Sequence, residues 1–219
     1  MVQISIDRIR VPPGQRVLLQ AVSWEEFEAI LEELGEGRST RIAYDNGTLE
    51  IMTPLPEHEA SKEIIGDLLK ALLEELDIEF LTLGSTTFKN QQMVQGIEPD
   101  QCFYIQNEAK VRGKKRLDLA VDPPPDLAIE IDITSRTHPS IYAALKVAEL
   151  WRFESGKLQI NVLRSTQYLE VKESPTFPGM ALREAIVQYA NQSQISGRNS
   201  AIKAFRAWVR QQLASANQS

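Results

Sequence analysis

The chain has 219 residues, of which 42% are hydrophobic and 25% are charged, and its 24 Lys+Arg against 30 Asp+Glu give a formal net charge of −6. These proportions are those of an ordinary soluble globular protein, and they exclude collagen, a disulfide scaffold and a chain disordered along its full length. The single cysteine, Cys102, excludes an internal disulfide, and no apolar stretch is long enough to predict a membrane span. We therefore expect a cytoplasmic protein with one domain of generous size and no membrane partner.

The first part of the chain predicts a helix followed by a hairpin. Residues 23–34 carry apolar side chains at helical spacing, and Ser23 and Glu26 form the pattern of a capping box at the start of this helix. Asn46-Gly47 lies between two alternating apolar runs, which is the strongest short-range signal for a two-residue hairpin turn.

The middle of the chain predicts one long helix and several short strands. The helix extends from about 57 to 77 and carries an apolar stripe along one face. Three short strand candidates follow, at 79–83, 86–89 and 101–105. Residues 107–118 are expected to form a loop.

The remainder of the chain alternates strands and helices. A strand is expected at 126–133, and a helix is expected to begin at Pro139 and to run to about Glu149. The patterns that follow predict a hairpin of 158–164 with 167–173, and two helices at 180–189 and 201–213. This mixture of hairpins, a long helix and a strand–helix unit predicts an α/β (α+β) fold around a central mixed sheet flanked by helices.

Alternation along residues 126–133 separates aliphatic side chains from acids. Successive side chains of a strand point to opposite faces, so one face of this strand carries Asp126, Glu130 and Asp132. A solvent-facing strand would explain the pattern, but carboxylates this close repel one another unless a cation neutralises them. The pattern therefore also fits a site for a hard divalent ion such as Mg²⁺ or Mn²⁺, which binds carboxylate oxygens.

A second acidic unit lies upstream, where Pro99 and Asp100 stand at the entry to a predicted strand. A simple turn would explain this unit equally well. A carboxylate at the end of a strand can, however, point at a site that it shares with a neighbouring strand. Asp100, Glu130 and Asp132 together predict a metal site built from two strands.

The order and spacing of these motifs resemble the Uma2 family (DUF820) of restriction-like endonucleases, in particular its cyanobacterial branch. The resemblance covers roughly residues 20–190 and is carried by YDNGTLEIMTPLPEHE at 44–59, EPDQCFYI at 98–105 and PPDLAIEIDITSRT at 124–137. It implies a PD-(D/E)XK nuclease fold, in which a central mixed sheet is flanked by helices. It also implies Mg²⁺-dependent cleavage of a DNA phosphodiester bond.

The resemblance also implies roles for single residues. Asp100 corresponds to the proline–aspartate element and Glu130 to the acid of the following strand, and Asp132 stands where the family motif has its lysine. Lys146 on the next predicted helix, or Lys89, would then have to supply the missing cation.

The resemblance further implies that the long helix contributes an acid to the site, either Glu59 or Glu63, and Glu59 is the preferred candidate. Two solvated residues beside the apolar stripe are the alternative interpretation. His58 and His138 have no second histidine at ligand spacing, which argues against a zinc site.

Binding of DNA requires cations near the phosphates. Residues 110–116 contain five basic residues and no acid, and a loop that clamps a DNA backbone would use Lys110, Arg112, Lys114, Lys115 and Arg116. An ordinary solvated loop is the alternative. We expect residues 1–192 to form the nuclease-like domain, and 193–219 to add a basic amphipathic helix that docks on this domain or on a partner, including a second copy in a homodimer.

Three hypotheses remain at this point. The first is a Mg²⁺-dependent endonuclease that acts on DNA. The second is a catalytically impaired module of the same fold that acts in binding or assembly, because the motif lysine is absent. The third, a metal-dependent phosphodiesterase acting on a small nucleotide, has the weakest support.

Overall fold

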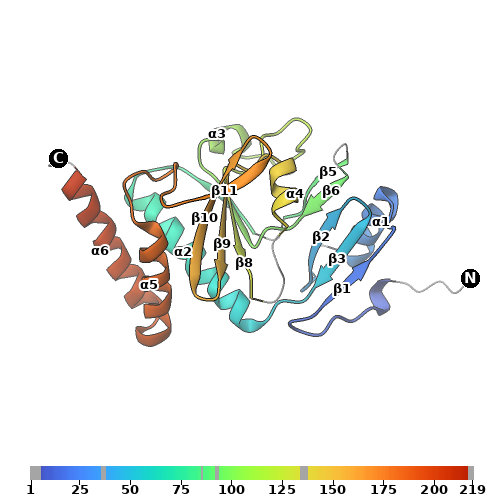
Figure 1. The fold of residues 1–219 in the computed structure, drawn as a ribbon, viewed down its shortest axis with the longest axis horizontal. Helices are drawn as coiled ribbons and strands as arrows, with labels where there is room; N and C mark the ends of the chain where they lie inside the picture. The colour runs from blue at the N-terminus through green and yellow to red at the C-terminus, as the bar shows by residue number, and fades with distance from the viewer. Residues whose placement is uncertain (1–5, 36–37, 85, 92–93, 134–137, 217–219) are drawn as a thin grey trace, which may run out of the picture.

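The computed structural model describes residues 6–35, 38–84, 86–91, 94–133 and 138–216. The predicted α/β class is confirmed, and the strands are divided between two sheets where the sequence suggested one (Figure 1). The described parts begin with a short 3-10 helix, η1 (Ile6–Arg8). Within them, no helix is both long and apolar enough to span a bilayer.

The five-stranded sheet lies towards the N-terminal end of the molecule and is antiparallel throughout (Figure 1). Its strands lie in the order β1 (Arg16–Leu19), β3 (Thr48–Met52), β2 (Arg41–Asp45), β6 (Gln95–Ile97) and β5 (Phe88–Asn90). The predicted hairpin is formed by β2 and β3, because Asn46 and Gly47 both adopt the positive φ that a tight hairpin turn requires.

Helix α1 (Trp24–Leu34) covers this sheet, and its core is held by aromatic contacts. Ser23 and Glu26 form the predicted capping box, in which each side chain accepts a hydrogen bond from the other residue's backbone N–H. The Phe27 ring stacks on Tyr44 of β2 with 4.5 Å between the ring centroids. Both side chains are almost completely buried.

The six-stranded sheet forms the centre of the molecule. Its strands lie in the order β11 (Gln167–Val171), β10 (Lys157–Arg164), β9 (Glu149–Glu154), β8 (Leu127–Ile131), β7 (Gln101–Tyr104) and β4 (Leu81–Leu83). The pair β8–β9 is parallel, and the other pairs described are antiparallel. The connection between β8 and β9 carries helix α4 (Pro139–Ala144).

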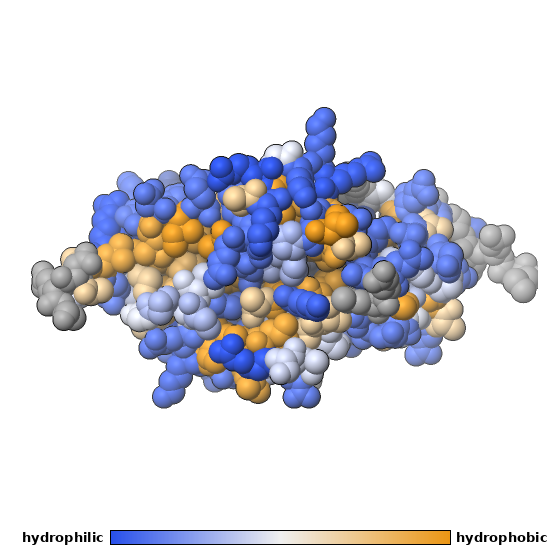
Figure 2. Space-filling view, turned by 90° about the horizontal axis from the view of Figure 1, so that it is seen from above, coloured by the Kyte–Doolittle hydropathy of each residue, from blue (hydrophilic) through white to orange (hydrophobic). Residues whose placement is uncertain are grey.

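Helices cover both faces of the six-stranded sheet. On one face, α2 (Pro56–Glu75), α5 (Leu182–Ser196) and α6 (Arg198–Ala216) enclose the main hydrophobic core together with Leu127, Ile129 and Ile131 of β8 (Figure 1). On the other face, α3 (Glu108–Val111) and α4 enclose a second core. The face of the molecule seen in Figure 2 carries hydrophilic side chains with hydrophobic areas between them.

Two local predictions are wrong. The segment expected to be a loop contains the short helix α3. The helix that begins at Pro139 ends at Ala144, and Glu149 already belongs to β9. The reason is that Lys146 adopts a positive φ of 61°, which does not allow the helix to continue, and Leu150 and Trp151 are then buried in the strand β9.

Helix α6 packs against α2 and α5. Phe205 and Val209 are fully buried in the main core. Arg206 and Arg210 pair with Glu75 of α2 at 3.0 Å and 2.6 Å. This C-terminal helix therefore shares the main core with the sheet.

Candidate active site

The central feature of the site is a pair of carboxyl groups from two adjacent strands. Asp100 immediately precedes β7, and Glu130 lies in β8, which pairs with β7. The Ile131 backbone N–H donates a hydrogen bond of 2.8 Å to Asp100 Oδ2, which fixes this carboxylate beside Glu130. The structure therefore brings together the two acids that the sequence placed on separate strands.

Glu130 lies in an environment that opposes its ionisation. Burial and the neighbouring negative charge of Asp100 raise the pKa of Glu130 well above its usual value, and the hydrogen bond that Tyr142 donates offsets only part of this effect. Burial and the nearby Glu130 also raise the pKa of Tyr142. These effects favour the protonated form of Glu130, and a bound cation would favour the ionised form.

His58, in the first turn of α2, is a direct partner of Asp100. Its Nε2 lies 3.0 Å from Asp100 Oδ2, and its Nδ1 lies 3.3 Å from Glu59 Oε1. Burial disfavours a charge on His58, but its hydrogen bond and charge attraction to Asp100 outweigh burial and raise the pKa of His58. Because Asp100 Oδ2 accepts from both His58 and Ile131, Asp100 Oδ1 is the oxygen left for other partners.

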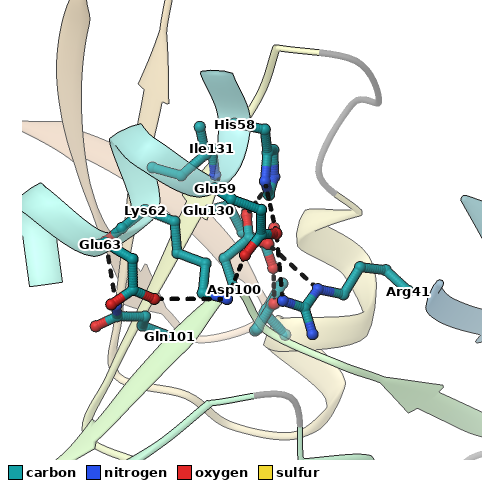
Figure 3. A network of polar contacts seen from close by, with 10 residues as sticks. Arg41, His58, Glu59, Lys62, Glu63, Asp100, Gln101, Glu130 and Ile131 are labelled. Atoms are coloured by element: carbon teal, nitrogen blue, oxygen red, sulfur yellow. Dashed lines mark hydrogen bonds and ion pairs between the residues drawn. The ribbon is translucent and has the colours of Figure 1, made fainter. Parts of the chain in front are cut away.

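Arg41, at the start of β2, brings a permanent positive charge from the other sheet. Its Nε lies 3.9 Å from Asp100 Oδ1, and its Nη2 lies 3.5 Å from Glu59 Oε1 (Figure 3). Glu59 also accepts a hydrogen bond of 2.9 Å from Lys62. Burial opposes ionisation of Glu59, but the hydrogen bond from Lys62 and the charges of Lys62 and Arg41 lower its pKa. The lowered pKa favours the ionised form of Glu59, and its carboxylate contacts both Lys62 and Arg41 beside the acid pair.

A close approach of α2 to β7 positions the helix residues of the site. Gly66 has no side chain, and a Cβ at this position would lie 1.9 Å from Gln101 Oε1. The Gln101 amide donates a hydrogen bond of 3.1 Å to the Lys62 carbonyl oxygen (Figure 3). This contact holds the helix beside the strand, and His58 can therefore reach Asp100.

Asp132 is not part of the acid pair. Its carboxylate accepts a hydrogen bond of 2.8 Å from Arg152 Nε of β9. Within the described ranges of the chain, no three His, Cys, Asp or Glu side chains come together as a metal-binding group. Asp132 is thus engaged by Arg152, although its negative charge still contributes to the raised pKa of Glu130.

Lys146 is exposed in the turn after α4 and does not line the cavity beside the acid pair. The positive φ that ends α4 at this residue removes Lys146 from the helix on which the sequence placed it. The nearest described cationic nitrogens to Asp100 belong instead to His58 and Arg41.

A small cavity of about 40 Å³ opens beside the acid pair. Such a volume holds an ion or a few waters, since one water needs about 10–15 Å³ of this kind of space. Polar and charged side chains from both sheets and from α2 line it, namely Arg41, Glu50, His58, Glu98, Asp100, Glu130 and His138. The site therefore lies between the two sheets.

The basic loop expected to bind DNA divides into two parts. Lys110 donates to Asn107 at 2.8 Å, and Arg112 makes two hydrogen bonds to Glu108. Lys114 pairs with Asp122, whereas Lys115 and Arg116 are exposed. Two of the five cations of this loop, Arg112 and Lys114, are thus matched by neighbouring acids.

The family model described as "Uma2: Putative restriction endonuclease" matches residues 24–188. The chain belongs to the Uma2 family. One similar solved structure is that of a "putative nuclease belonging to DUF820" from Anabaena variabilis, at 12% sequence identity and a TM-score of 0.48. The match covers 81% of this chain and 97% of the other. No curated protein matches this Uma2 chain.

The sequence of this Uma2 protein does not identify Arg41, Lys62 or Tyr142 as site residues, and for His58 it offers a ligand or a helix cap as alternatives. Arg41 opens a hairpin strand and carries no local pattern that points to a distant carboxylate. His58 directly precedes Glu59 at the start of an amphipathic helix, and this adjacency was the one local signal available.

Proposed function

We propose that this Uma2 protein is a Mg²⁺-dependent endonuclease that hydrolyses phosphodiester bonds of DNA. The observation that carries the proposal is the pairing of Asp100 with the half-buried Glu130, whose pKa is raised, beside a small polar cavity. Two acids held together in this way are energetically costly, and perturbed carboxyl groups of this kind concentrate at functional sites. The family description supports the same class of activity.

The residues present fit a divalent ion held by two carboxylates. Mg²⁺ is commonly bound by one or two carboxylates and keeps several waters, and Mn²⁺ accepts the same oxygen ligands. Asp100 Oδ1 and the Glu130 carboxylate would hold the ion, which would take the place of the proton on Glu130. When bound, it would supply positive charge that stabilises the phosphate under attack and polarises the attacking water.

The chain itself supplies the remaining functions. His58 and the Ile131 N–H fix Asp100 Oδ2, so that the orientation of this carboxylate is set before substrate binds. The guanidinium group of Arg41 lies beside the cavity. It is suited to bind a phosphate group, because its planar N–H donors match the arrangement of the phosphate oxygens. We assign to Arg41 the positive charge that Asp132 cannot provide.

The first test is a plasmid-nicking assay with Mg²⁺ or Mn²⁺ and with a chelator. The wild-type protein should nick DNA only with metal, and Glu130→Gln should lower the rate by at least about 100-fold because a metal ligand is lost. Glu184→Gln, an exposed carboxylate on α5, is the matched control and should keep the wild-type rate. Nicking by Glu130→Gln at the wild-type rate would contradict the proposal.

Arg41 is tested separately. Arg41→Ala should lower kcat by about 100-fold or more while KM changes little, since the guanidinium is assigned to the phosphate as it is attacked. Arg41→Lys should restore part of the rate, and Lys146→Ala should be neutral. A larger loss in Lys146→Ala than in Arg41→Ala would return the role to Lys146.

A second candidate function is a catalytically impaired module that binds DNA or assembles with a partner. The ion pair between Asp132 and Arg152 favours it, because the position of the motif lysine is occupied by a neutralised acid. Specific DNA binding without metal-dependent nicking at high protein concentration would support this candidate over the first.

A further inference from the structure

A surface cleft of about 690 Å³ lies beside the basic loop and is separate from the cavity of the acid pair. It is formed by the segment around β4 and β5, the start of the loop after α3, and Arg38. Among the residues that the structure describes, its lining contains five cationic side chains and no acid, namely Arg38, Lys89, Lys114, Lys115 and Arg116. In a chain with a net charge of −6, this concentration of positive charge is a local feature.

The cations differ in how far their charge is already matched. Three of them pair with acids that do not line the cleft, through Arg38–Glu98, Lys89–Glu28 and Lys114–Asp122. Lys115 and Arg116 are exposed, and the described parts of the chain give them no ion-pair partner. These two side chains therefore leave the rim of the cleft with an excess of positive charge.

The floor of the cleft is apolar. Leu81 and Leu83 of β4, together with Leu117, line it below the cationic rim, and Thr86 and Thr87 add hydroxyl groups at one side. The volume lies within the range of about 300–1,000 Å³ that small-molecule sites occupy. A ligand with an anionic group for the rim and an apolar part for the floor fits this arrangement.

Glu98 connects the cleft to the acid pair. It lines the small cavity together with Asp100. Glu98 also accepts a hydrogen bond from Thr87 and forms an ion pair with Arg38, and both of these residues line the cleft. A second hollow of about 620 Å³ shares Arg38, Lys89 and Arg116, but it also contains Glu28 and Glu32 of α1. The purely basic lining is therefore confined to the side next to Lys115.

We propose that this cleft binds the sugar–phosphate backbone of the nucleic acid at a position flanking the bond that is cut. The phosphates would lie against Lys115, Arg116 and Lys89, and the leucine floor would contact the sugars. DNA is chosen as the ligand because the proposal rests on the proposed nuclease function. The cleft adds a second binding site for the same DNA strand, apart from the acid pair. Within the basic loop, Lys110 and Arg112 are outside the cleft and do not take part.

The test compares two double variants of the same loop with the same change of charge. Lys115→Gln/Arg116→Gln removes the unmatched cations of the cleft, and Lys110→Gln/Arg112→Gln removes two cations outside it. Binding of a fluorescent DNA duplex is measured by anisotropy with a chelator present, so that cleavage does not interfere. Thermal melting of each variant confirms that it is folded.

We expect the cleft variant to weaken binding by about 10-fold or more at moderate salt. We also expect it to lower the slope of log K against log salt by about 2, one unit for each lost phosphate contact. The variant outside the cleft should bind with nearly the wild-type affinity and slope. Equal weakening by both variants would show an effect of net charge alone and would overturn the proposal.

This outcome is separable from that of the nuclease assay. If the wild-type protein nicks DNA but the cleft variant binds and nicks like it, the cleft proposal fails and the nuclease proposal stands. If the cleft variant loses binding while the wild-type protein does not nick DNA, the cleft proposal stands and the nuclease proposal fails.

Discussion

At the scale of single residues, the protonation of Glu130 decides the chemistry of the acid pair. Glu130 accepts from Tyr142 and lies beside Asp100, which the Ile131 N–H and His58 hold in place. The raised pKa of Glu130 favours its protonated form, and a cation bound beside it would favour the ionised form. The same residue thus connects stability, pH and the binding of a metal ion.

This connection predicts a pH dependence of stability in the presence of a chelator. Because the pKa of Glu130 is raised in the folded state, its stabilising effect is complete below the unfolded pKa of about 4.3 and is lost as the pH rises towards the folded value. The free energy of unfolding should fall by up to about 1.4 kcal/mol per pH unit over this window. Glu130→Gln should remove that component.

The measurement is urea unfolding of the wild-type protein and of Glu130→Gln between pH 4 and pH 8. The difference between their free energies of unfolding separates the effect of Glu130 from the effects of Asp100, His58 and Tyr142, which are present in both proteins. Added Mg²⁺ should restore the stability of the wild-type protein at the upper end of the range, because the ion replaces the proton. Parallel curves for wild type and variant would contradict this assignment.

At the scale of elements, the site depends on how closely α2 lies against β7. Gly66 leaves the space that the Gln101 side chain fills, and Gln101 holds the Lys62 carbonyl oxygen. The helix thereby carries His58 to Asp100. A single glycine in a helix interior normally destabilises the helix, so its use here has a packing reason.

Gly66→Ala should destabilise the protein by about 1–3 kcal/mol despite the better helix propensity of alanine, because the new Cβ displaces Gln101 from a packed position. It should also lower the activity, since α2 moves away from Asp100. Gly66→Ala combined with Gln101→Ala should recover part of the stability by restoring space. Denaturant unfolding of the single and double variants measures this coupling.

The attachment of α6 to α2 predicts a second effect of acid. The hydrogen bonds from Arg210 and Arg206 lower the pKa of Glu75 to about 2 in the folded state. The stabilisation is therefore present above the unfolded pKa of about 4.3 and is lost as the pH falls from there towards 2.

Glu75→Gln should be less stable than wild type at pH 6, and the difference should disappear near pH 2. Thermal melting of both proteins across this range is the measurement. Glu173→Gln, a carboxylate outside this contact, should show no such convergence. If the difference between Glu75→Gln and wild type is constant with pH, the pairing is not the source of the stability.

At the scale of the whole molecule, the cores are shared between elements that are distant in sequence. Phe88 and Ile97 of the five-stranded sheet pack in the same core as Tyr142 and Leu150, which belong to the six-stranded sheet and its connection. The main core likewise combines α2 with the two C-terminal helices. We therefore expect the sheets and α6 to unfold together.

Phe205→Ala tests this expectation, because Phe205 is the fully buried aromatic residue of α6. The variant should lose about 3–5 kcal/mol of stability in a single transition, like Phe177→Ala elsewhere in the same core. Phenylalanine fluorescence is weak, so circular dichroism and tryptophan emission should be followed together. An unchanged main transition would show that α6 is an independent appendage.

The sequence predicted the elements whose signals are local. The capping box at Ser23, the turn at Asn46-Gly47 and the stripe along α2 all appear where the pattern placed them. Failures occurred where a local pattern was compatible with two structures. The apolar run after Lys146 fitted a continuing helix, and tertiary burial made it the strand β9 instead.

The candidate site was also predicted only in part, because local patterns in the sequence identify acids but not their distant partners. Asp100 and Glu130 stood out because acids are uncommon in strands, and adjacent strands brought them together. Asp132 met the same criterion, but Arg152 on the parallel neighbour β9 neutralises it. No local feature of the sequence distinguishes an acid that will find an arginine from one that will not.

The sequence by itself determined the long helix α2, the hairpins β2–β3 and β10–β11, and the two acids on or beside neighbouring strands, because turn chemistry and side-chain alternation act over a few residues. Only the tertiary structure decided which charges surround those acids. Arg41 comes from one sheet, His58 from α2 and Tyr142 from the region of α4, and they meet at Asp100 and Glu130 through packing between distant segments. Electrostatic partnership depends on distance in space, and chain folding alone sets that distance.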